Sequence, residues 1–465
     1  MLRVPLAPVV ASLVLLAACG GSDATAPATI AANTTFTGVF SSGVERGTVT
    51  LTAGTPASGT LTLEDEAPVP LTGTFTSATS SFSLAGGGYT VTATPQAEAS
   101  ASIGSDLSIG RPAAPGASFT ATAASTPALS GTVIGPRITG LGALSAVVTT
   151  TAATSTRYCG VYSGDDAGMG DVLISGSNVA VAISGMGGSG TLSGTASGST
   201  VTASATFTHP NGQKNTLTLR LGLSGTTLSG PASSSMYPNE RVNFTASSTA
   251  CRTTVPSPPY TSYIGYVASY GRAERLSLVP GAPASGTLEW VASTPPHQRV
   301  TYGLTGTWNA TTGAFNLGYT PPNTVGAPAI TVNATATGYS VLGLAVGGLL
   351  VSGGQTSLVG AMGTNSALPV QRYCGTMIGG TASAPGSVNG NVILLLAGSR
   401  ALGVATWTAP GTGVAQALVG STGGPWVYLA GKTDIFLAGT TTGSGYAGTW
   451  SHVNDTKGSF TVTTC

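Results

Sequence analysis

The spacing of four cysteines constrains the fold more than any other feature of the chain. Cys159 and Cys251 lie 92 positions apart, and Cys374 and Cys465 lie 91 positions apart. Each pair begins in the same word, Arg-Tyr-Cys-Gly, at 157–160 and at 372–375. A disulfide requires α-carbons within about 7 Å. Because the spacing repeats, we predict that each pair forms a disulfide within its own copy of a duplicated unit.

A second repeated word supports the duplication. The hexapeptide PASGTL occurs at 56–61 and again at 283–288. Within each copy, an aromatic residue followed two positions later by glycine opens a module, at Phe36, Tyr158, Tyr263 and Tyr373. We therefore expect two pairs of modules and a proline-rich linker. The expected bounds are 36–156 and 157–251 in the first copy, 252–262 for the linker, and 263–370 and 371–465 in the second copy.

Residue alternation predicts β-strands. At 201–208, Val, Ala and Phe alternate with Thr and Ser, and Asn211-Gly212 is typical of a hairpin turn before the alternating leucines of 217–221. Similar runs predict about eight strands in the second module, near 157–164, 171–176, 178–184, 189–194, 200–208, 215–222, 225–229 and 241–248. The expected fold class is all-β, a tandem array of four small antiparallel meander modules. The pattern alone leaves barrel and sandwich open.

The N-terminal segment predicts export and a lipid anchor. Arg3 is followed by an apolar run at 9–16 that is too short to span a bilayer, and then by Leu-Ala-Ala-Cys ending at Cys19. This segment resembles the lipobox of bacterial lipoproteins. The resemblance implies cleavage of a signal peptide at 1–18 and acylation of Cys19, with palmitate as a typical acyl chain. Gly20 follows the cysteine, and in that family this favours the outer membrane. Residues 19–35 are expected to form a flexible tether.

The mature modules resemble a known class of barrels at the level of pattern. The words LTGTF (71–75), LTGTW (304–308) and YAGTW (446–450) are similar to those of avidin-type and lipocalin-type meander barrels. No ligand-binding residue is carried over from that likeness. Charged residues make up 7% of the chain, which argues against nucleic acid as a partner, since phosphates require clustered Lys and Arg.

Few residues suggest chemistry, and no catalytic residue or cofactor is predicted. The HExxH, CxxC and GxSxG patterns are absent from the sequence. Asp165, Asp166 and Asp171 could together hold calcium through oxygen ligands, or they could lie in a solvated turn. The acidic residues at 64–66 are expected at a charged hairpin tip, although paired carboxylates can also serve glycoside hydrolysis.

All the tryptophans lie in the second copy, and they are the candidate binding residues of the chain. They could stack on sugars or anchor a partner, or they could enlarge cores and fill contacts between modules. The five are Trp290, Trp308, Trp407, Trp426 and Trp450. The apolar segments 392–397 and 341–351 do not alternate, so we expect both faces of these strands to be covered, through contact between the third and fourth modules.

Three functions remain open at the level of sequence. The first is a non-enzymatic lipoprotein of the cell envelope with a structural or binding role toward a glycan or a protein, attached to the membrane by its lipid. The second is a carrier of a small apolar ligand inside a barrel. The third is a hydrolase that uses an acidic pair. The sequence does not distinguish the periplasmic from the surface-exposed face of the membrane.

Overall fold

The computed structural model describes residues 30–465, apart from several connecting segments. These are residues 43–44, 65, 96–117, 121–127, 137, 139–141, 150–153, 186–187, 209–213, 252–259, 270–271, 292–298, 320–329, 338–339, 347–356, 365–368, 382–383, 410–411, 432–434 and 453–455. Cys19 and the predicted signal peptide lie outside the described residues. The described part contains no helix long and apolar enough to cross a membrane.

The chain folds into four antiparallel barrels of eight strands each, which confirms the expected fold class and decides for barrels over sandwiches. In the first copy, barrel 1 consists of β1 (Thr35–Ser42), β2 (Glu45–Thr52), β3 (Ala57–Leu63), β4 (Val69–Thr76), β5 (Ser81–Gly86), β6 (Tyr89–Pro95), β8 (Ala128–Ile134) and β9 (Gly142–Val148). Barrel 2 consists of β10 (Ser155–Gly164), β11 (Gly168–Ser175), β12 (Asn178–Gly185), β13 (Gly188–Ser197), β14 (Thr200–Thr208), β15 (Lys214–Ser224), β16 (Thr227–Ser234) and β17 (Val242–Ser247).

The second copy repeats this arrangement. Barrel 3 consists of β18 (Ser262–Ser269), β19 (Arg272–Val279), β20 (Ala284–Val291), β21 (Arg299–Asn309), β22 (Ala314–Tyr319), β23 (Ile330–Thr337), β24 (Ser340–Val346) and β25 (Ser357–Thr364). Barrel 4 consists of β26 (Gln371–Thr381), β27 (Ala384–Ala397), β28 (Arg400–Ala409), β29 (Thr412–Thr422), β30 (Trp426–Gly431), β31 (Ile435–Thr442), β32 (Gly445–His452) and β33 (Thr456–Thr464). A 3-10 turn, η1 (Ser248–Ala250), follows β17.

Each barrel closes at a seam, where its first strand pairs with its last. In each module, the glycine two positions after the opening aromatic residue makes this close pairing possible. A β-carbon at Gly38, Gly160, Gly265 or Gly375 would overlap backbone atoms of the closing strand. The four glycines pair with Ala146, Ala246, Ala361 and Val462 respectively. Glycine is therefore required at these positions because the closing backbone approaches so closely.

The disulfides lie at the seams of barrels 2 and 4. Cys159 is bonded to Cys251 and Cys374 is bonded to Cys465, with α-carbons 5.0 and 5.7 Å apart. This is the pairing within each copy that the repeated spacing predicts. In both barrels the bond fixes the opening strand to the residues that follow the closing strand, so each disulfide supports the seam covalently.

Barrel 2 carries an additional strand that comes from barrel 1. The short strand β7 (Ser118–Thr120) belongs to the long connection between β6 and β8, and it pairs with β14 at Thr206–Thr208. β13 pairs with β14 over Thr200–Ser204, so β7 pairs with the part of this edge that β13 does not reach. The connection of one barrel thus contributes to the wall of the next.

The interior of every barrel is filled by its own side chains. Inward residues alternate with outward ones, as in β15, where Leu217, Leu219 and Leu221 are buried. In each barrel these inward residues form one hydrophobic cluster. Such burial supplies most of the driving force for folding, at roughly 25 cal/mol per Å² of apolar surface.

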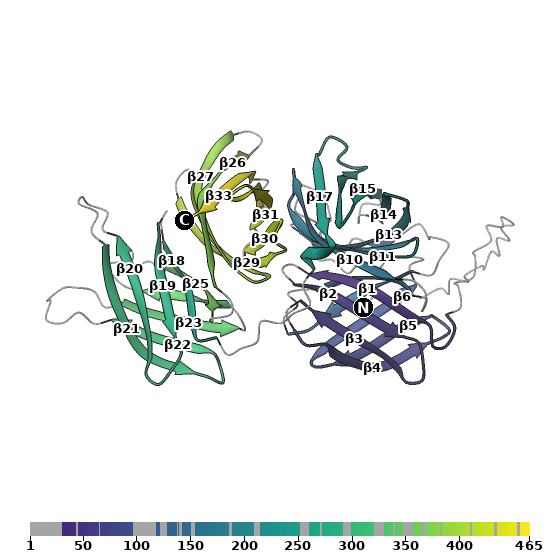
Figure 1. Ribbon diagram of the computed structural model, residues 1–465, viewed down its shortest axis with the longest axis horizontal. Helices are drawn as coiled ribbons and strands as arrows, with labels where there is room; N and C mark the ends of the chain where they lie inside the picture. Colours follow the sequence, from purple (N-terminus) through teal and green to yellow (C-terminus); the bar gives the residue numbers. More distant parts are fainter. Residues whose placement is uncertain are drawn as a thin grey trace, which may run out of the picture.

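The barrels also pack against one another through outward-facing residues (Figure 1). Barrels 1 and 2 share a cluster that includes Val39, Val147 and Leu173. Barrels 3 and 4 share a cluster that includes Tyr266, Met362, Leu395 and Val404. Barrels 2 and 4 meet through Cys159, Val161, Met169, Trp426 and Tyr428. Barrel 4 therefore contacts both barrel 2 and barrel 3, and barrel 1 packs on barrel 2.

Coverage of both faces, which we expect for the two non-alternating apolar segments, is found for only one of them. Segment 392–397 is covered on both faces, because Leu394 and Leu396 point into barrel 4 while Leu395 and Ala397 pack on barrel 3. The expectation for segment 341–351 is wrong in its described part. Leu342, Leu344 and Val346 of β24 are 38%, 46% and 43% exposed, because barrel 4 covers β18 and β25 instead.

Candidate functional site

The largest group of buried charges lies where barrels 1, 2 and 4 meet, and we call it the charged junction. It contains three arginines and three carboxylates, and all six side chains are at most 13% exposed. Barrel 1 contributes Glu45, Arg46 and Glu64, barrel 2 contributes Arg157 and Asp171, and barrel 4 contributes Arg400. The numbers of positive and negative groups balance, which buried ionic groups require.

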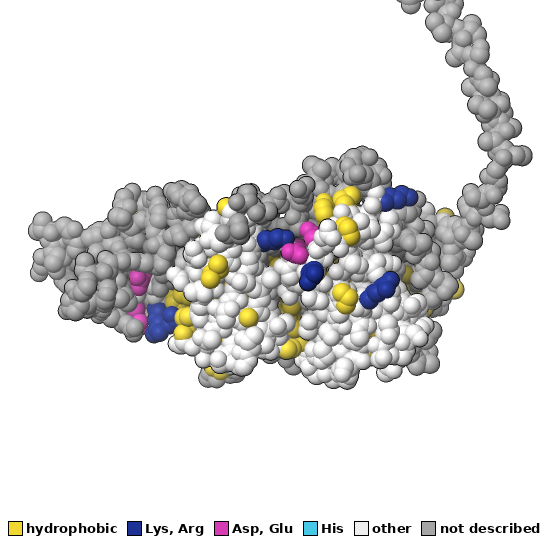
Figure 2. Space-filling view, turned by 90° about the horizontal axis from the view of Figure 1, so that it is seen from above, with side chains coloured by type: hydrophobic (Ala, Val, Ile, Leu, Met, Phe, Trp, Pro, Cys, Tyr) yellow, Lys and Arg dark blue, Asp and Glu magenta, His cyan; other side chains and the backbone are white. Residues whose placement is uncertain are grey.

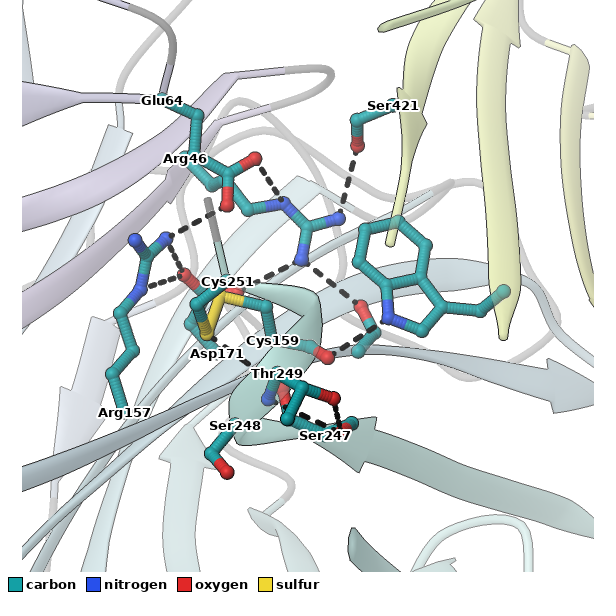
Figure 3. Close-up of a disulfide and its surroundings, with 12 residues drawn as sticks. Arg46, Glu64, Arg157, Cys159, Asp171, Ser247, Ser248, Thr249, Cys251 and Ser421 are labelled. Carbon is teal, nitrogen blue, oxygen red and sulfur yellow. Dashed lines mark hydrogen bonds and ion pairs between the residues drawn. A yellow bond between two sulfur atoms is a disulfide. The ribbon is translucent and has the colours of Figure 1, made fainter. Parts of the chain in front are cut away.

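Arg46 is at the centre of the charged junction (Figure 3). Its Nη1 donates to Asp171 Oδ1 over 3.0 Å, and its Nη2 donates to Ser421 Oγ of barrel 4 over 3.0 Å. Its guanidinium lies 4.2 Å from the ring centroid of Trp426, and its Nε lies 3.7 Å from Glu64 Oε2. One side chain of barrel 1 therefore contacts both other barrels, through directional bonds and a cation–π contact.

Arg157 and Arg400 complete the charged junction. Arg157 pairs with Asp171 through two nitrogens and lies 3.6 Å from Glu64. Burial would lower the pKa of Arg157, but the nearby Asp171 and Glu64 outweigh this effect and raise it. Arg400 donates from Nη2 to the Glu64 carbonyl over 2.8 Å and lies 3.6 Å from Glu45. Each carboxylate of the group therefore faces a guanidinium.

The disulfide Cys159–Cys251 lies directly beside the charged junction (Figure 3). Cys159 is fully buried, and its carbonyl oxygen accepts a hydrogen bond from Trp426 Nε1 over 2.9 Å. The seam of barrel 2 is thus held to barrel 4 by a hydrogen bond as well as by apolar packing.

The three aspartates proposed as a cation site do not converge. Asp171 is in the charged junction, whereas Asp165 is partly exposed and binds Lys457 Nζ and the Arg241 backbone N–H. Asp166 is buried and accepts from the Ala167 backbone N–H over 2.7 Å. Among the described residues, no three His, Cys, Asp or Glu side chains are grouped closely enough to hold a metal ion. The solvated-turn alternative is also wrong for Asp166 and Asp171.

The Asp166 carboxyl has a strongly perturbed pKa. Burial raises its pKa to about 7, the Ala167 N–H and Lys457 oppose the rise, and Glu240 adds to it. Because Glu240 acts electrostatically on Asp166, these two residues are a candidate for the acidic pair of the hydrolase hypothesis. Asp166 is 3% exposed, however, and neither carboxylate lines either of the two described cavities. The described residues therefore give no cavity in which this pair could act on a substrate, although Glu240 is only partly buried.

The tryptophans are placed mainly in cores and contacts. Trp407 and Trp450 are buried in barrel 4, Trp308 packs 4.3 Å from the Phe315 ring in barrel 3, and Trp426 is at the charged junction. The backbone of Trp290 pairs with Val300, and its side chain lies outside the described residues. Packing is thus the structural role of Trp308, Trp426 and Trp450, and the interpretation of Trp426 and Trp450 as an exposed binding face is not supported. Trp407 packs in the core of barrel 4 and also lines the larger cavity on its wall.

Glu64 departs from the sequence-based expectation. The sequence predicts a charged hairpin tip at residues 64–66, yet Glu64 is 4% exposed and paired with two arginines. Sequence reasoning also misses Arg46, Arg157 and Arg400 as a group. The usable signal is the position of Arg157 in the repeated Arg-Tyr-Cys-Gly word, but nothing in the sequence indicates its partners in barrel 1.

Two shallow cavities lie on the wall of barrel 4, with volumes of about 210 and 390 Å³. They share Asn391 and Thr406, and the described lining of both consists of uncharged residues. The lining therefore offers no general acid or base.

Comparisons with known proteins do not assign the chain to a family. No family model and no curated protein matches the sequence. One of the solved structures that align with it is intact Ap-TbpB, a transferrin binding protein B, with its N and C lobes. The two sequences are 8% identical, and the alignment covers 74% of this chain and 85% of that chain with a TM-score of 0.17. A second is a double mutant of transferrin binding protein B from Haemophilus parasuis Hp5, with 10% identity over 72% of this chain and 83% of that chain and a TM-score of 0.16. A third is the isotype 1 transferrin binding protein B from serogroup B Neisseria meningitidis, with 10% identity over 72% of this chain and 84% of that chain and a TM-score of 0.17. These TM-scores do not define a common arrangement of barrels.

Proposed function

We propose that this chain is a lipoprotein of the cell envelope, anchored through Cys19, with a non-catalytic structural or binding role toward a glycan or a protein. In this proposal, residues 1–18 are removed and the barrels are held at the outer membrane. The tether is shorter than the sequence predicts and ends before Ile30, because Ile30 is buried in the core of barrel 1 and Thr35 begins β1. The lipobox-like word before Cys19 supports the anchor.

The charged junction is the observation that carries the non-catalytic role. Catalytic sites need titratable groups that converge on an accessible cleft. Here the buried charged groups bind one another across three barrels, and their geometry holds the barrels in a fixed arrangement. A rigid array of this kind is suited to presenting a surface at a distance from the membrane.

The filled interiors favour a binding or structural role over the carrier hypothesis. An eight-stranded barrel can hold a small molecule if its interior is left open. The large buried side chains Phe36, Phe244, Phe315 and Phe460 occupy the four interiors. A carrier would have to displace part of a packed core, so this alternative is not supported by the described residues.

Mass spectrometry of the amino-terminal peptide tests the anchor. From cells that produce the full chain, we expect a peptide that begins at Cys19 and carries diacylglycerol and an amide-linked acyl chain. The Cys19→Ala variant should be released into the soluble fraction. A wild-type chain that begins elsewhere, or that carries a free Cys19 thiol, would overturn the lipoprotein assignment.

Cross-linking in intact cells tests the binding role. With the lipidated full chain, we expect a reproducible glycan or protein adduct that depends on the anchor and is reduced in Cys19→Ala cells. The same adduct in equal amount from both strains would mean that display at the membrane is unimportant, and this result would contradict the proposal.

A further inference from the structure

Barrels 2 and 4 can be compared position by position, because the repeated word Arg-Tyr-Cys-Gly has the same register in both. Cys159 pairs with Asp171 of β11, and Cys374 pairs with Ile393 of β27. The residues of the first three strands therefore correspond one to one, and alternate positions form the outer wall. The corresponding pairs on this wall are Val161 and Thr376, Met169 and Asn391, Asp171 and Ile393, Ala182 and Val404, and Ser184 and Thr406.

In barrel 2 this wall is covered by side chains of the neighbouring barrels. Val161 and Met169 are at most 1% exposed, and they form one apolar cluster with Trp426 of barrel 4. Arg46 of barrel 1 binds the Asp171 carboxylate of the same wall over 3.0 Å. The wall is therefore the surface through which barrel 2 docks on the rest of the molecule.

The corresponding wall of barrel 4 is exposed along β26 and β27, and the two cavities of about 210 and 390 Å³ lie on it. Thr376 and Asn391 are exposed, and Ile378 is 52% exposed. Ala273 of β19 occupies the position that corresponds to Arg46, so barrel 3 supplies no guanidinium there. β30 and β31 lie on the side of barrel 4 toward barrel 2, whereas β26 and β27 lie on another side (Figure 1). The cavities thus lie where neighbouring barrels fill the wall of barrel 2.

The lining of the larger cavity suits an aromatic side chain that carries a hydrogen-bonding group. Met377, Ile378 and Trp407 offer apolar contacts, and thioether and indole groups both pack favourably on aromatic rings. Asn391 and Thr406 place an amide and a hydroxyl in the same lining. Because the described lining of both cavities is uncharged, it offers no partner for an ionic group. Tyrosine and tryptophan meet both requirements, and they are common anchors of protein interfaces.

The polar replacements on this wall indicate a reversible contact. Thr376 and Asn391 lie where barrel 2 has buried apolar residues. Permanent interfaces are more hydrophobic than those that form and separate, because each surface of a reversible contact must be soluble alone. Ile378 lies beside these polar residues where barrel 2 has Ser163, so the wall also keeps an exposed apolar contact.

A second copy of this chain does not offer a matching surface. Barrel 4 docks on barrel 2 through Trp426 and Tyr428, and the corresponding positions of barrel 2 are Thr200 and Thr202. Both threonines are exposed, whereas Trp426 and Tyr428 are already buried inside each molecule. The occupant that fits is therefore a different protein.

We propose that the wall of barrel 4 formed by β26, β27 and β28 is the docking site of a different protein, which inserts a tyrosine or tryptophan side chain into the cavities. The molecule itself contains the precedent for this contact, since Trp426 of barrel 4 covers the corresponding wall of barrel 2. The volume of the larger cavity falls within the roughly 300–1,000 Å³ of typical binding pockets. This inference rests on the proposed binding role and assigns it a surface and a kind of partner.

Methyl NMR on the full mature chain tests the cavities. The chain is produced with Cys19→Ala so that it is soluble, and its isoleucine δ1-methyl groups are labelled, because Ile378 lines the larger cavity and Ile393 the smaller one. The probes are 3-methylindole and p-cresol, which are the side chains of tryptophan and tyrosine, and cyclohexylmethanol as an aliphatic comparison. We expect saturable shifts of both methyl groups with the aromatic probes, at an affinity about threefold to tenfold higher than with cyclohexylmethanol.

Asn391→Trp fills the wall that the two cavities share and provides the blocked variant. Asn391 is exposed, so the chain should still fold, and circular dichroism and thermal unfolding check this. The aromatic probes should bind this variant at least about tenfold more weakly. Asn316→Trp, at an exposed position on β22 of barrel 3, is the matched control and should bind them as the wild type does. Shifts of Ile264, 40% exposed on barrel 3, as large as those of Ile378 would overturn the site, as would the absence of shifts at both cavities.

Photo-cross-linking in intact cells tests the partner. With a photoreactive benzoylphenylalanine at position 376 of the lipidated chain, we expect an adduct with a different protein. Asn391→Trp should reduce this adduct at least about tenfold, and Asn316→Trp should leave it unchanged. An adduct with a second copy of the chain or with a glycan, or the absence of any adduct from position 376, would overturn the docking site. If the envelope adduct of the lipidated chain persists in that case, the inference fails and the proposed function stands. If that adduct is also missing, both fail.

Discussion

Trp426 Nε1 of barrel 4 donates a hydrogen bond to the Cys159 carbonyl oxygen of barrel 2, over 2.9 Å. This bond joins residues from the two copies of the duplicated unit. Trp426 is fully buried, and it also lies against the Arg46 guanidinium. A single side chain therefore links both copies at the point where the disulfide closes barrel 2.

Replacement of Trp426 should uncouple the two copies. Trp426→Ala leaves a cavity and an unpaired Cys159 carbonyl, with an expected cost of about 3–5 kcal/mol. Calorimetry should show the thermal transition splitting into separate transitions of the two copies. Trp450→Phe is the control, because Trp450 Nε1 donates to the Ile378 carbonyl oxygen over 3.2 Å within barrel 4. This variant removes a tryptophan hydrogen bond but leaves the contact between the two copies in place. A Trp426→Ala variant that keeps one transition at an unchanged temperature would contradict the role of this contact.

Removal of Arg46 should be strongly destabilising. Arg46→Met leaves Asp171 and Glu64 with one guanidinium fewer, and breaking a buried ion pair costs about 3–5 kcal/mol. Chemical denaturation measures the loss. The partly exposed pair Arg275–Glu289, separated by 3.8 Å, provides the comparison, since Arg275→Met should change stability by less than about 1 kcal/mol. Equal effects in the two variants would mean that the charged junction does not act as a buried network.

The seam glycines should resist substitution. Gly265→Ala places a β-carbon against the backbone of β25, so we expect barrel 3 to lose at least about 2 kcal/mol and to be cleaved faster in limited proteolysis. Gly303 lies in the same barrel, and a β-carbon there would point into open space, so Gly303→Ala should be neutral or slightly stabilising. The seam explanation is wrong if both variants are cleaved at the wild-type rate.

Stability should fall as the pH rises from about 4 to 7, because of Asp166. The folded pKa of about 7 lies above the unfolded value of 3.8, so the native state holds a proton in this range that the unfolded state has released. Asp166→Asn removes this titration and keeps the acceptor for the Ala167 N–H. The free energy of unfolding of the variant should therefore increase relative to that of the wild type as the pH rises, by up to about 4 kcal/mol at pH 8. Parallel pH–stability curves for the two chains would exclude an effect of Asp166.

The two disulfides should differ in their rate of reduction. Cys465 is exposed, whereas Cys159 is fully buried under Trp426. Under native conditions with a mild reductant, peptide mapping should find Cys374–Cys465 opened first. Each bond closes a loop of about 90 residues, and its loss should cost about 4–5 kcal/mol in the chain-entropy model. Faster opening of Cys159–Cys251 would contradict the burial of that bond in solution.

Local patterns predict most of the fold. The alternation at 201–208 and 217–221 places β14 and β15 correctly, and the repeated cysteine spacing predicts both disulfides. These features can be predicted because strand period and duplication are written in neighbouring or repeated residues. The prediction for segment 341–351 fails, since its lack of alternation resembles that of 392–397 while its neighbours in space differ.

The charged junction could not be predicted, for a physical reason. Arg46 and Asp171 are separated by 125 residues and Arg46 and Ser421 by 375, so their contacts depend on how whole barrels pack. A charged residue in a strand is normally solvated, and Glu64 beside a turn resembles such a case. The pairing of β7 with β14 could not be predicted for the same reason. The part of β14 that β7 pairs with is defined only by how far β13 pairs along β14 when barrel 2 closes.

The balance of the charged junction also determines how the outside of the molecule behaves. Of 16 basic and 15 acidic residues in the chain, three of each sign are withdrawn into this contact. The described surface is therefore sparsely charged, and Figure 2 shows few charged side chains on one face, where the acidic ones lie beside basic ones. Long-range steering toward ionic partners is weak on such a surface, so encounters depend on short-range fit and change little with the salinity of the surroundings.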